Sequence, residues 1–200
     1  NDPRFSPAGV LAPKSKADLA FTMHMLSWLA VDGTAAIVEF PGVLYRGAAE
    51  AKIRQYLVEY NYVDAVIQLP PDLFFGTTIG TCIIVLKKSK QDNSVLFVDA
   101  SKQFVRQGNK NKLSAENQEM ILETLAKRAD IDHVAALVNA EAIRENGFNL
   151  SVSSYVEAED TREEVDIVEL NARIKEIVER QAVLRASIDE IIADLEGGAR

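Results

Sequence analysis

The 200-residue sequence has a single cysteine, Cys82, so no disulfide bond can form within the chain. That absence is typical of proteins that work in a reducing cytoplasm. Cys82 lies in an apolar run, and we expect a buried, unreactive thiol there. No apolar stretch approaches the roughly 20 residues that a membrane-spanning helix needs, and no signal peptide is visible. We therefore expect a cytoplasmic protein that does not cross a membrane.

Other patterns are missing as well. No group of His, Cys, Asp and Glu has the spacing of metal ligands, so we expect no metal site. The dinucleotide fingerprint G-x-G-x-x-G is absent, which argues against half of a dehydrogenase. The chain starts at Asn1 rather than at methionine, with the loop-like run NDPRFSPAGVLAP, and we expect it to be a piece of a longer protein.

Acidic residues outnumber basic ones, 30 to 22, and the net charge of −8 argues against a nucleic-acid-binding protein when the chain is taken as a whole. The charge is unevenly distributed. Residues 1–112 hold 13 basic and 10 acidic side chains, whereas residues 113–200 hold 9 and 20. Only the first part could therefore approach a phosphate backbone, because the second would be repelled.

Hydrophobic periodicity predicts that helices and buried strands alternate in residues 1–112. Ser15 is the expected N-cap of the first helix, with Asp18 at the capping-box spacing. The alternation implies a mostly parallel sheet with helices on both faces. The last two strands are too close in sequence for a helical crossover, so we expect them to pair antiparallel at one edge. The predicted helices span 15–33 and 48–61, and the predicted strands span 34–40, 62–69, 81–88 and 94–100.

The fold class that follows is α/β, with part of a doubly wound, mixed sheet of the Rossmann-like kind. Half a sheet has no reason to be stable alone, which agrees with a piece of a longer protein. The chain then divides into an α/β part (1–112), a helical and irregular connecting part (113–160) and a long C-terminal helix of the coiled-coil type (161–200). The later predictions are a polar loop at 101–112, a helix at 114–129 capped by Ser114, irregular structure over 130–160 with a short helix near 139–145, and a helix from about 165 to 195.

Sheets of this kind bind ligands at the carboxyl ends of their strands, where the following loops converge. The loop PPDLFFGTT places two phenylalanines in a turn. Phe74 and Phe75 either tuck under the sheet as a hydrophobic plug or offer a flat face to a planar ligand, and stacking contributes ~1–3 kcal/mol per nucleobase. Gly76 would allow close approach of the backbone, and Thr77 adds a hydroxyl group that could bond a phosphate or a base edge.

Basic residues follow two other strands. Tyr45 and Arg46 lie in the loop after strand 34–40, where Arg46 is either solvated or in contact with a phosphate or base. The loop 101–112 contains four cations and no acid, which favours contact with a DNA backbone over a merely solvated loop. These cations are Lys102, Arg106, Lys110 and Lys112.

Five segments occur in the order LAPKSKADLAFTMHML, GVLYRGAAEAKIRQYL, DAVIQLPPDLFFGTTIGTCIIVLKK, VLFVDASKQF and NKNKLS. Together they resemble the modification subunit of type I restriction–modification systems, over nearly the whole chain. The resemblance implies an adenine-N6 DNA methyltransferase that uses S-adenosylmethionine, acts on double-stranded DNA and assembles with a specificity subunit and a restriction subunit. The loop with Phe74 and Phe75 would then pack around an adenine flipped out of the duplex, at a cost of a few kcal/mol.

The family's catalytic Asn-Pro-Pro-Phe motif and its glycine-containing cofactor loop do not occur in the sequence. Pro70-Pro71 is no substitute, because Leu69 precedes the pair and Asp72 follows it. The resemblance implies that both motifs, and most of the S-adenosylmethionine site, lie upstream of Asn1. We therefore expect this chain alone to be inactive.

The long helix carries a heptad repeat in which Gln181 interrupts an otherwise apolar seam. Val178 and Ile192 widen the apolar face toward a helical bundle. The stripe could lie along its own domain or bind a partner helix, which the resemblance identifies as part of the specificity subunit. Without a partner, the exposed stripe should drive self-association. The seam consists of Ile167, Leu170, Ile174, Ile177, Gln181, Leu184, Ile188, Ile191 and Leu195.

Two functions remain open at this point. The chain is either part of a DNA adenine methyltransferase, contributing the target-base loop, DNA contacts and a docking helix, or a non-catalytic assembly module whose α/β part is only a platform. An Asn-Pro-Pro-Phe motif just upstream in the coding sequence would decide for the first.

Overall fold

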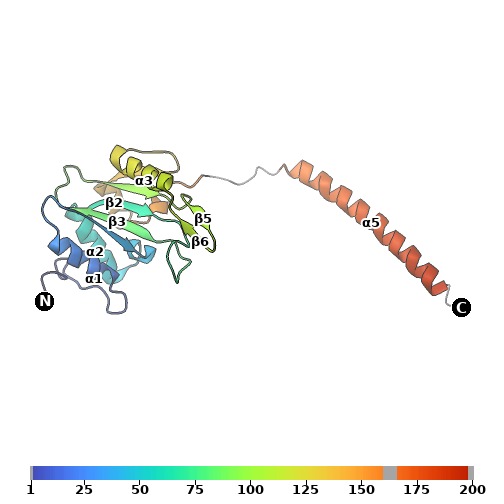
Figure 1. Cartoon of the computed structure of the whole chain (residues 1–200), viewed down its shortest axis with the longest axis horizontal. Helices are drawn as coiled ribbons and strands as arrows, with labels where there is room; N and C mark the ends of the chain where they lie inside the picture. Colours follow the sequence, from blue (N-terminus) through green and yellow to red (C-terminus); the bar gives the residue numbers. More distant parts are fainter. Residues whose placement is uncertain (1, 160–165, 198–200) are drawn as a thin grey trace. The chain divides into compact units, whose positions relative to one another are not determined.

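The computed structural model describes residues 2–159 and 166–197. The chain divides into two compact units, Asn1–Glu159 and Asp160–Arg200 (Figure 1). The first unit is a β-sheet with helices on both faces, and one long helix lies in the described part of the second. The predicted α/β class is confirmed.

The first unit is built on a five-stranded sheet with the order β1-β3-β2-β4-β7. The central strand, β2, is buried along almost its whole length because both of its faces are covered. β2 pairs parallel with β4, whereas the other three pairings of this sheet are antiparallel. The strands are β1 (Thr34–Glu39), β2 (Val63–Gln68), β3 (Cys82–Lys87), β4 (Ser94–Asp99) and β7 (Ala135–Asn139).

The predicted mostly parallel pairing is wrong, although the sheet is mixed as expected. β1 and β2 run in the same direction, as the intervening helix α2 (Ala48–Glu59) requires. β3 inserts between them, antiparallel to both, because the loop 69–81 reverses the chain without a helix. β3 and β4 therefore do not pair with each other. β1 becomes an edge strand with alternating exposure instead of a buried strand.

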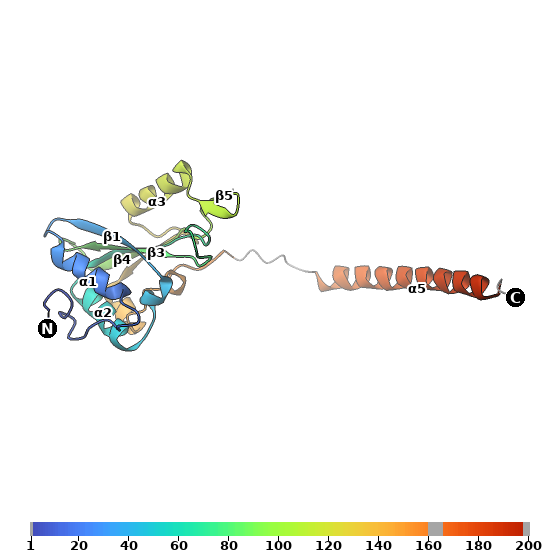
Figure 2. The same ribbon diagram turned by 60° about the horizontal axis from the view of Figure 1, so that its bottom comes forward.

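Helices lie on both faces of the sheet (Figure 2), and each face packs against an apolar core. Helices α1 (Asp18–Trp28), α2 and α4 (Ala140–Glu145) cover one face, where Leu19 of α1 is fully buried. Helix α3 (Ala115–Lys127) covers the opposite face and buries Ile121. The helices thus leave the carboxyl ends of β1, β2 and β4 to be covered by loops.

Local signals account for one helix start and fail for another. The Ser114 hydroxyl accepts a hydrogen bond from the Asn117 backbone N–H, and the Asn117 side chain accepts one from the Ser114 backbone, so the predicted cap of α3 is confirmed. The predicted N-cap Ser15 is wrong, because α1 starts at Asp18 after Ala17, without a side-chain cap. Burial of Leu19 against the sheet, rather than capping, marks that start.

Two stretches expected to be irregular contain strands. The basic segment forms a hairpin of β5 (Val105–Gln107) and β6 (Lys110–Lys112), joined by the two residues Gly108 and Asn109. β7 pairs with β4 at the edge of the main sheet, so part of the predicted connecting region belongs to the sheet unit. Short 3₁₀ turns occur at Pro41–Leu44 and Val152–Ser154.

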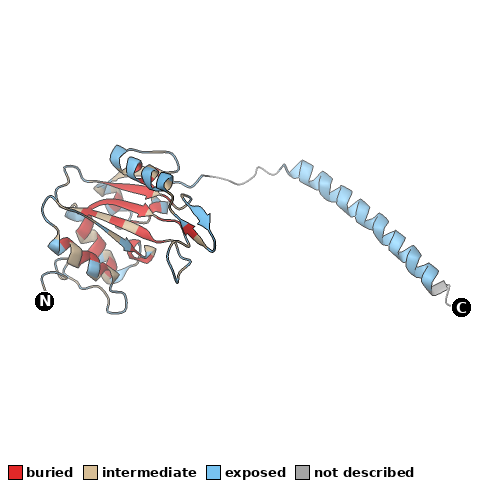
Figure 3. Cartoon of the chain, in the orientation of Figure 1, coloured by how far each residue is buried: buried red, intermediate tan, exposed pale blue. Residues whose placement is uncertain are grey.

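Helix α5 (Ile167–Gly197) makes up the second unit and confirms the predicted long helix. Its 31 residues span about 46 Å at 1.5 Å per residue. Every side chain described for it is exposed (Figure 3). None of the helices in the described ranges combines the length and the apolar character that a membrane crossing demands.

Candidate functional site

The loop between β2 and β3 carries the two phenylalanines at the carboxyl edge of the sheet. Phe75 is 101% exposed and Phe74 is 41% exposed, so a hydrophobic plug is excluded for Phe75. Gly76 has φ +79°, in the left-handed region that favours glycine. The Thr77 hydroxyl accepts a hydrogen bond from the Ile79 backbone N–H at 3.1 Å, inside the loop itself.

The β5–β6 hairpin contacts this loop through its charged side chains. The Lys110 ammonium donates to the carbonyl oxygens of Phe74 and Thr77, each at 3.0 Å. The Arg106 guanidinium lies 3.4 Å from a carboxylate oxygen of Asp72, in the same loop. Two of the four predicted DNA-contacting cations are therefore brought together with the phenylalanine loop, and both contact it.

Asn111 lies between Lys110 and Lys112, and no sequence pattern predicted it as a site residue. It is buried, and its side-chain amide donates to the Pro71 carbonyl oxygen at 2.8 Å. Its backbone N–H donates to the Asp72 carbonyl oxygen at 3.0 Å. The Gly108-Asn109 pair was the available sequence signal for a hairpin, because two-residue turns of this kind join the two strands of a hairpin. Recognising that hairpin would have placed Asn111 opposite Arg106.

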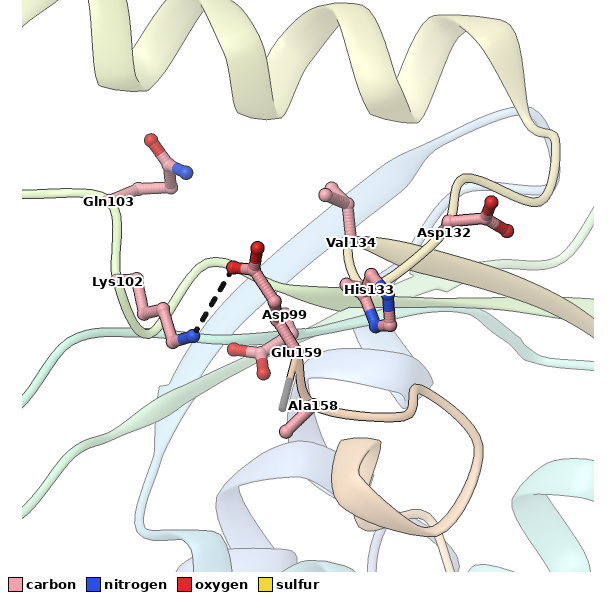
Figure 4. Close-up of a pocket in the computed structure, with 8 residues that line it drawn as sticks. All are labelled: Asp99, Lys102, Gln103, Asp132, His133, Val134, Ala158 and Glu159. Carbon is pink, nitrogen blue, oxygen red and sulfur yellow. Dashed lines mark ion pairs between the residues drawn. The ribbon is translucent and has the colours of Figure 1, made fainter. Parts of the chain in front are cut away.

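Lys102 lies apart from the hairpin, on a pocket of about 240 Å³ beyond the end of β4 (Figure 4). Its ammonium pairs with Glu159 at 3.8 Å, where both side chains are exposed. Asp99 and Asp132 also line this pocket, so an anionic ligand would meet three carboxylates there. Lys112 is exposed at the end of β6. The four cations thus do not form one cluster.

Arg46 is turned toward the protein. Its guanidinium lies 3.2 Å from a Glu50 carboxylate oxygen and 3.7 Å from one of Asp18. It also packs so closely over Gly42 that a side chain at that position would collide with it. Tyr45, next to it, is exposed at the carboxyl edge. Of the two predicted residues in this loop, only Tyr45 presents most of its side chain to solvent.

Two buried ionisable groups lie near the end of β1. Glu39 accepts a hydrogen bond from the Thr22 hydroxyl at 2.9 Å, and burial raises the pKa of its carboxyl group. Burial also raises the pKa of the Cys82 thiol to about 12, and the predicted burial of this cysteine is confirmed. Over residues 2–159 and 166–197, no group of three or more His, Cys, Asp or Glu side chains could hold a metal ion.

An apolar hollow lies beside β1, away from the loops described above. Phe21, Met25, Trp28 and Ile37 line it, and most of the Phe21 and Trp28 side chains are exposed. β1 is at one end of the sheet order, so its outer edge has no strand partner among the described residues. An apolar surface beside an unpaired strand is typical of a face on which further protein packs.

Comparison with known proteins gives a consistent result. Residues 1–164 match the family model described as N-6 DNA Methylase. The chain is 48% identical, over 98% of its length and 36% of the relative's, to the Type I restriction enzyme MpnII methylase subunit of Mycoplasma pneumoniae. It is 32% identical, over 94% of its length and 33% of the relative's, to the Type I restriction enzyme MjaVII methylase subunit of Methanocaldococcus jannaschii.

A solved structure agrees with these relatives. The type I restriction-modification system methyltransferase subunit from Streptococcus thermophilus matches 78% of this chain and 34% of its own, with 48% identity and a TM-score of 0.77. The 200 residues thus span about a third of the length of the relatives they match.

Proposed function

The chain belongs to the N-6 DNA methylase family, and on that premise we propose that it is part of the modification subunit of a type I restriction–modification enzyme, an adenine-N6 DNA methyltransferase. The observation that carries the proposal is the presentation of Phe75, wholly exposed, on a loop at the carboxyl edge of the sheet. In this proposal Phe74, Phe75, Gly76 and Thr77 surround an adenine flipped out of the duplex, and the aromatic faces stack on it.

S-adenosylmethionine is the methyl donor in this proposal. The glycine-containing loop and the Asn-Pro-Pro-Phe motif expected for the donor and the reacting amine do not occur in the sequence. The residues present therefore do not make a cofactor site by themselves, and we assign them no step in methyl transfer. Their proposed role is to hold the target base and the DNA.

We propose that the part of the protein with those motifs packs on the outer edge of β1. Helices α1 and α2 lie on the same face of the sheet, and β1, α2 and β2 form a crossover between strands of the same direction. Such crossovers are right-handed in nearly all proteins. A strand preceding α1 would therefore lie on the side of β1 away from β3. Covering the exposed rings of Phe21 and Trp28 would then be part of completing the sheet.

DNA contacts in this proposal come from the exposed cations of the sheet unit. Lys112 is available for a phosphate, and Lys102 is available once its exposed pair with Glu159 is exchanged, because exposed ion pairs are weak. Arg106 and Lys110 are engaged with the loop, and Arg46 is engaged with Asp18 and Glu50.

Helix α5 is proposed to dock the specificity subunit. All nine residues of its heptad seam are exposed, and the apolar ones require a covering partner. The relatives are named as subunits of type I restriction enzymes, which supports partners of this kind, including a restriction subunit. The same exposure favours the second candidate function, an assembly module without a part in catalysis.

Transfer of a labelled methyl group to DNA tests the proposal and separates the two candidates. The full-length subunit with its specificity subunit should methylate adenine, and the 200-residue chain alone should not. Transfer by the isolated chain would overturn our assignment of the motifs to other residues. An intact assembly that binds DNA without transferring methyl groups would favour the assembly module.

A further inference from the structure

The loop between β2 and β3 contains two residues with positive φ, and hydrogen bonds within the loop tie only its two ends. Asp72 has φ +58°, which is uncommon for a residue other than glycine, and Gly76 has φ +79°. Glycine adopts this conformation freely, but at Asp72 it is strained and persists only when its surroundings hold it. The Thr77 hydroxyl bond to Ile79 ties only the far end of the loop.

Two consecutive residues of β6 bind four carbonyl groups of this loop. The Asn111 side chain and backbone donate to Pro71 and Asp72, at 2.8 and 3.0 Å. Lys110 donates to Phe74 and Thr77, at 3.0 Å each. These four carbonyls bracket Phe75, which itself contributes an exposed side chain. The loop therefore owes its shape to a hairpin more than 30 positions later in the sequence.

We propose that Lys110 and Asn111 are positioning residues, which hold the loop from Pro71 to Thr77 in the shape that presents Phe75 to the target base. The proposal rests on the function proposed above for Phe75. It assigns Lys110 a different role from the phosphate contact that the basic composition of this segment suggests.

The geometry around the Lys110 ammonium favours positioning over phosphate binding. An ammonium group has three N–H donors. Two of them meet the carbonyls of Phe74 and Thr77, and a carboxylate oxygen of Asp72 lies 3.9 Å from the nitrogen. One N–H is left for a phosphate, and the Asp72 carboxylate beside it would repel that phosphate. Lys112 is on the same strand and is exposed, which makes it a matched control.

Kinetics of the full-length subunit with its specificity subunit test the role of Lys110. Lys110→Met keeps the aliphatic stem and removes the donors. We expect kcat for methylation to fall about 10-fold, because the competent loop conformation becomes a minor state, while KM for DNA changes less than about 2-fold. The salt slope, which is the slope of log K for DNA binding against log salt concentration, should not change. Lys110→Arg should restore part of kcat, because a guanidinium can also donate to two carbonyls.

Lys112→Met should reduce the slope of log K against log salt concentration by about 1, as for the loss of one phosphate contact, and should leave the loop in place. If Lys110→Met instead lowers the slope by about 1 and leaves kcat intact, Lys110 is a phosphate contact and the proposal is overturned.

Proteolysis of the same assembly provides a readout independent of activity. Chymotrypsin cleaves after phenylalanine and needs a mobile segment, so cleavage after Phe74 or Phe75 reports release of the loop. The rate of chymotrypsin cleavage after Phe74 or Phe75 should rise about 10-fold in Lys110→Met and stay at the wild-type value in Lys112→Met. Equal rates in both variants would overturn the positioning role. If the wild-type assembly transfers no methyl group, the proposed function fails, while this comparison still decides whether Lys110 holds the loop.

Discussion

The two units of the chain use their apolar residues in opposite ways. In the sheet unit, residues such as Phe97 and Leu96 are fully buried, and helices cover both faces of the sheet. In α5, the apolar residues Ile174, Ile188 and Leu195 are exposed, like the charged residues around them. The sheet unit therefore obtains most of its stability from its own core, whereas α5 can gain stability from burial only by association.

The same contrast occurs within the sheet unit. Phe97 and Phe75 are both phenylalanines close to the carboxyl edge, yet one is 0% exposed and the other is 101% exposed. Phe97 stacks on Tyr155 with ring centroids 4.2 Å apart. Burial of the first stabilises the fold, and exposure of the second provides, in the function proposed above, a surface for the target base. Variants that change folding alone or binding alone would show that different residues carry the two.

Removal of α5 should have the largest effect. A chain that ends at Glu159 should keep the melting temperature and the near-ultraviolet circular dichroism spectrum of the sheet unit, because the core of that unit contains no residue of α5. In the full-length context, deletion of the helix should abolish co-purification with the specificity subunit, since the seam is lost entirely. Retained binding without the helix would show that the seam serves another purpose.

Alanine substitutions at the two phenylalanines should separate stability from activity. Phe97→Ala should lower the free energy of unfolding by ~3–5 kcal/mol, as expected for a fully buried aromatic residue. Phe75→Ala should change it by less than ~0.5 kcal/mol but should lower methylation by the full-length assembly ~5- to 150-fold, the equivalent of ~1–3 kcal/mol of stacking. Thermal melting and methyl transfer measured on both variants check this. Normal activity of Phe75→Ala would remove the ring from the site.

Replacement of the polar residue in the seam should have a smaller effect. Gln181→Leu removes a polar group whose burial in a helical interface costs ~1–3 kcal/mol without a partner. The isolated chain should therefore self-associate about 10-fold more tightly, as measured by sedimentation equilibrium. Glu179→Gln, a change outside the a and d positions, is the control. If the two variants associate equally, Gln181 does not lie in the interface.

The Cys82 thiol should give the smallest effect. Its pKa is raised to about 12 in the folded protein, from 9.0 when unperturbed, by burial. The unfolded chain therefore loses this proton first, so the contribution of Cys82 to stability is complete below pH 9 and is lost as pH rises toward 12. At pH 8 the thiol should react with a disulfide reagent only after unfolding in urea. Rapid reaction of the folded chain would contradict its burial.

Several features of the fold were predictable because their signals are local. The capping pair of Ser114 and Asn117 marked the start of α3 within four residues. The heptad spacing of α5 predicted a helix with one apolar seam, and the apolar runs located β1 to β4. The phenylalanine pair pointed to a loop at the carboxyl edge, because a strand was expected to end just before it. Each of these inferences depends on residues close together in sequence.

Other features depend on contacts between distant segments. The insertion of β3 between β1 and β2 cannot be read from strand sequences that are all mostly apolar, because strand order depends on which neighbours pack best. The strands β5 and β6 contain three residues each, too few for a periodic pattern. The exposure of Phe75 and the opposite burial of Phe97 also follow from packing, since the two side chains are chemically identical.

Periodicity and capping act over a few residues, so the order of an α/β unit and a long amphipathic helix could be read from the sequence. The contacts of Lys110 and Asn111 with the carbonyls of a loop more than 30 positions earlier depend on the folded chain. The physical reason is that a basic side chain meets whichever acceptor the fold brings within about 3 Å, and a phosphate and a backbone carbonyl offer it similar hydrogen bonds.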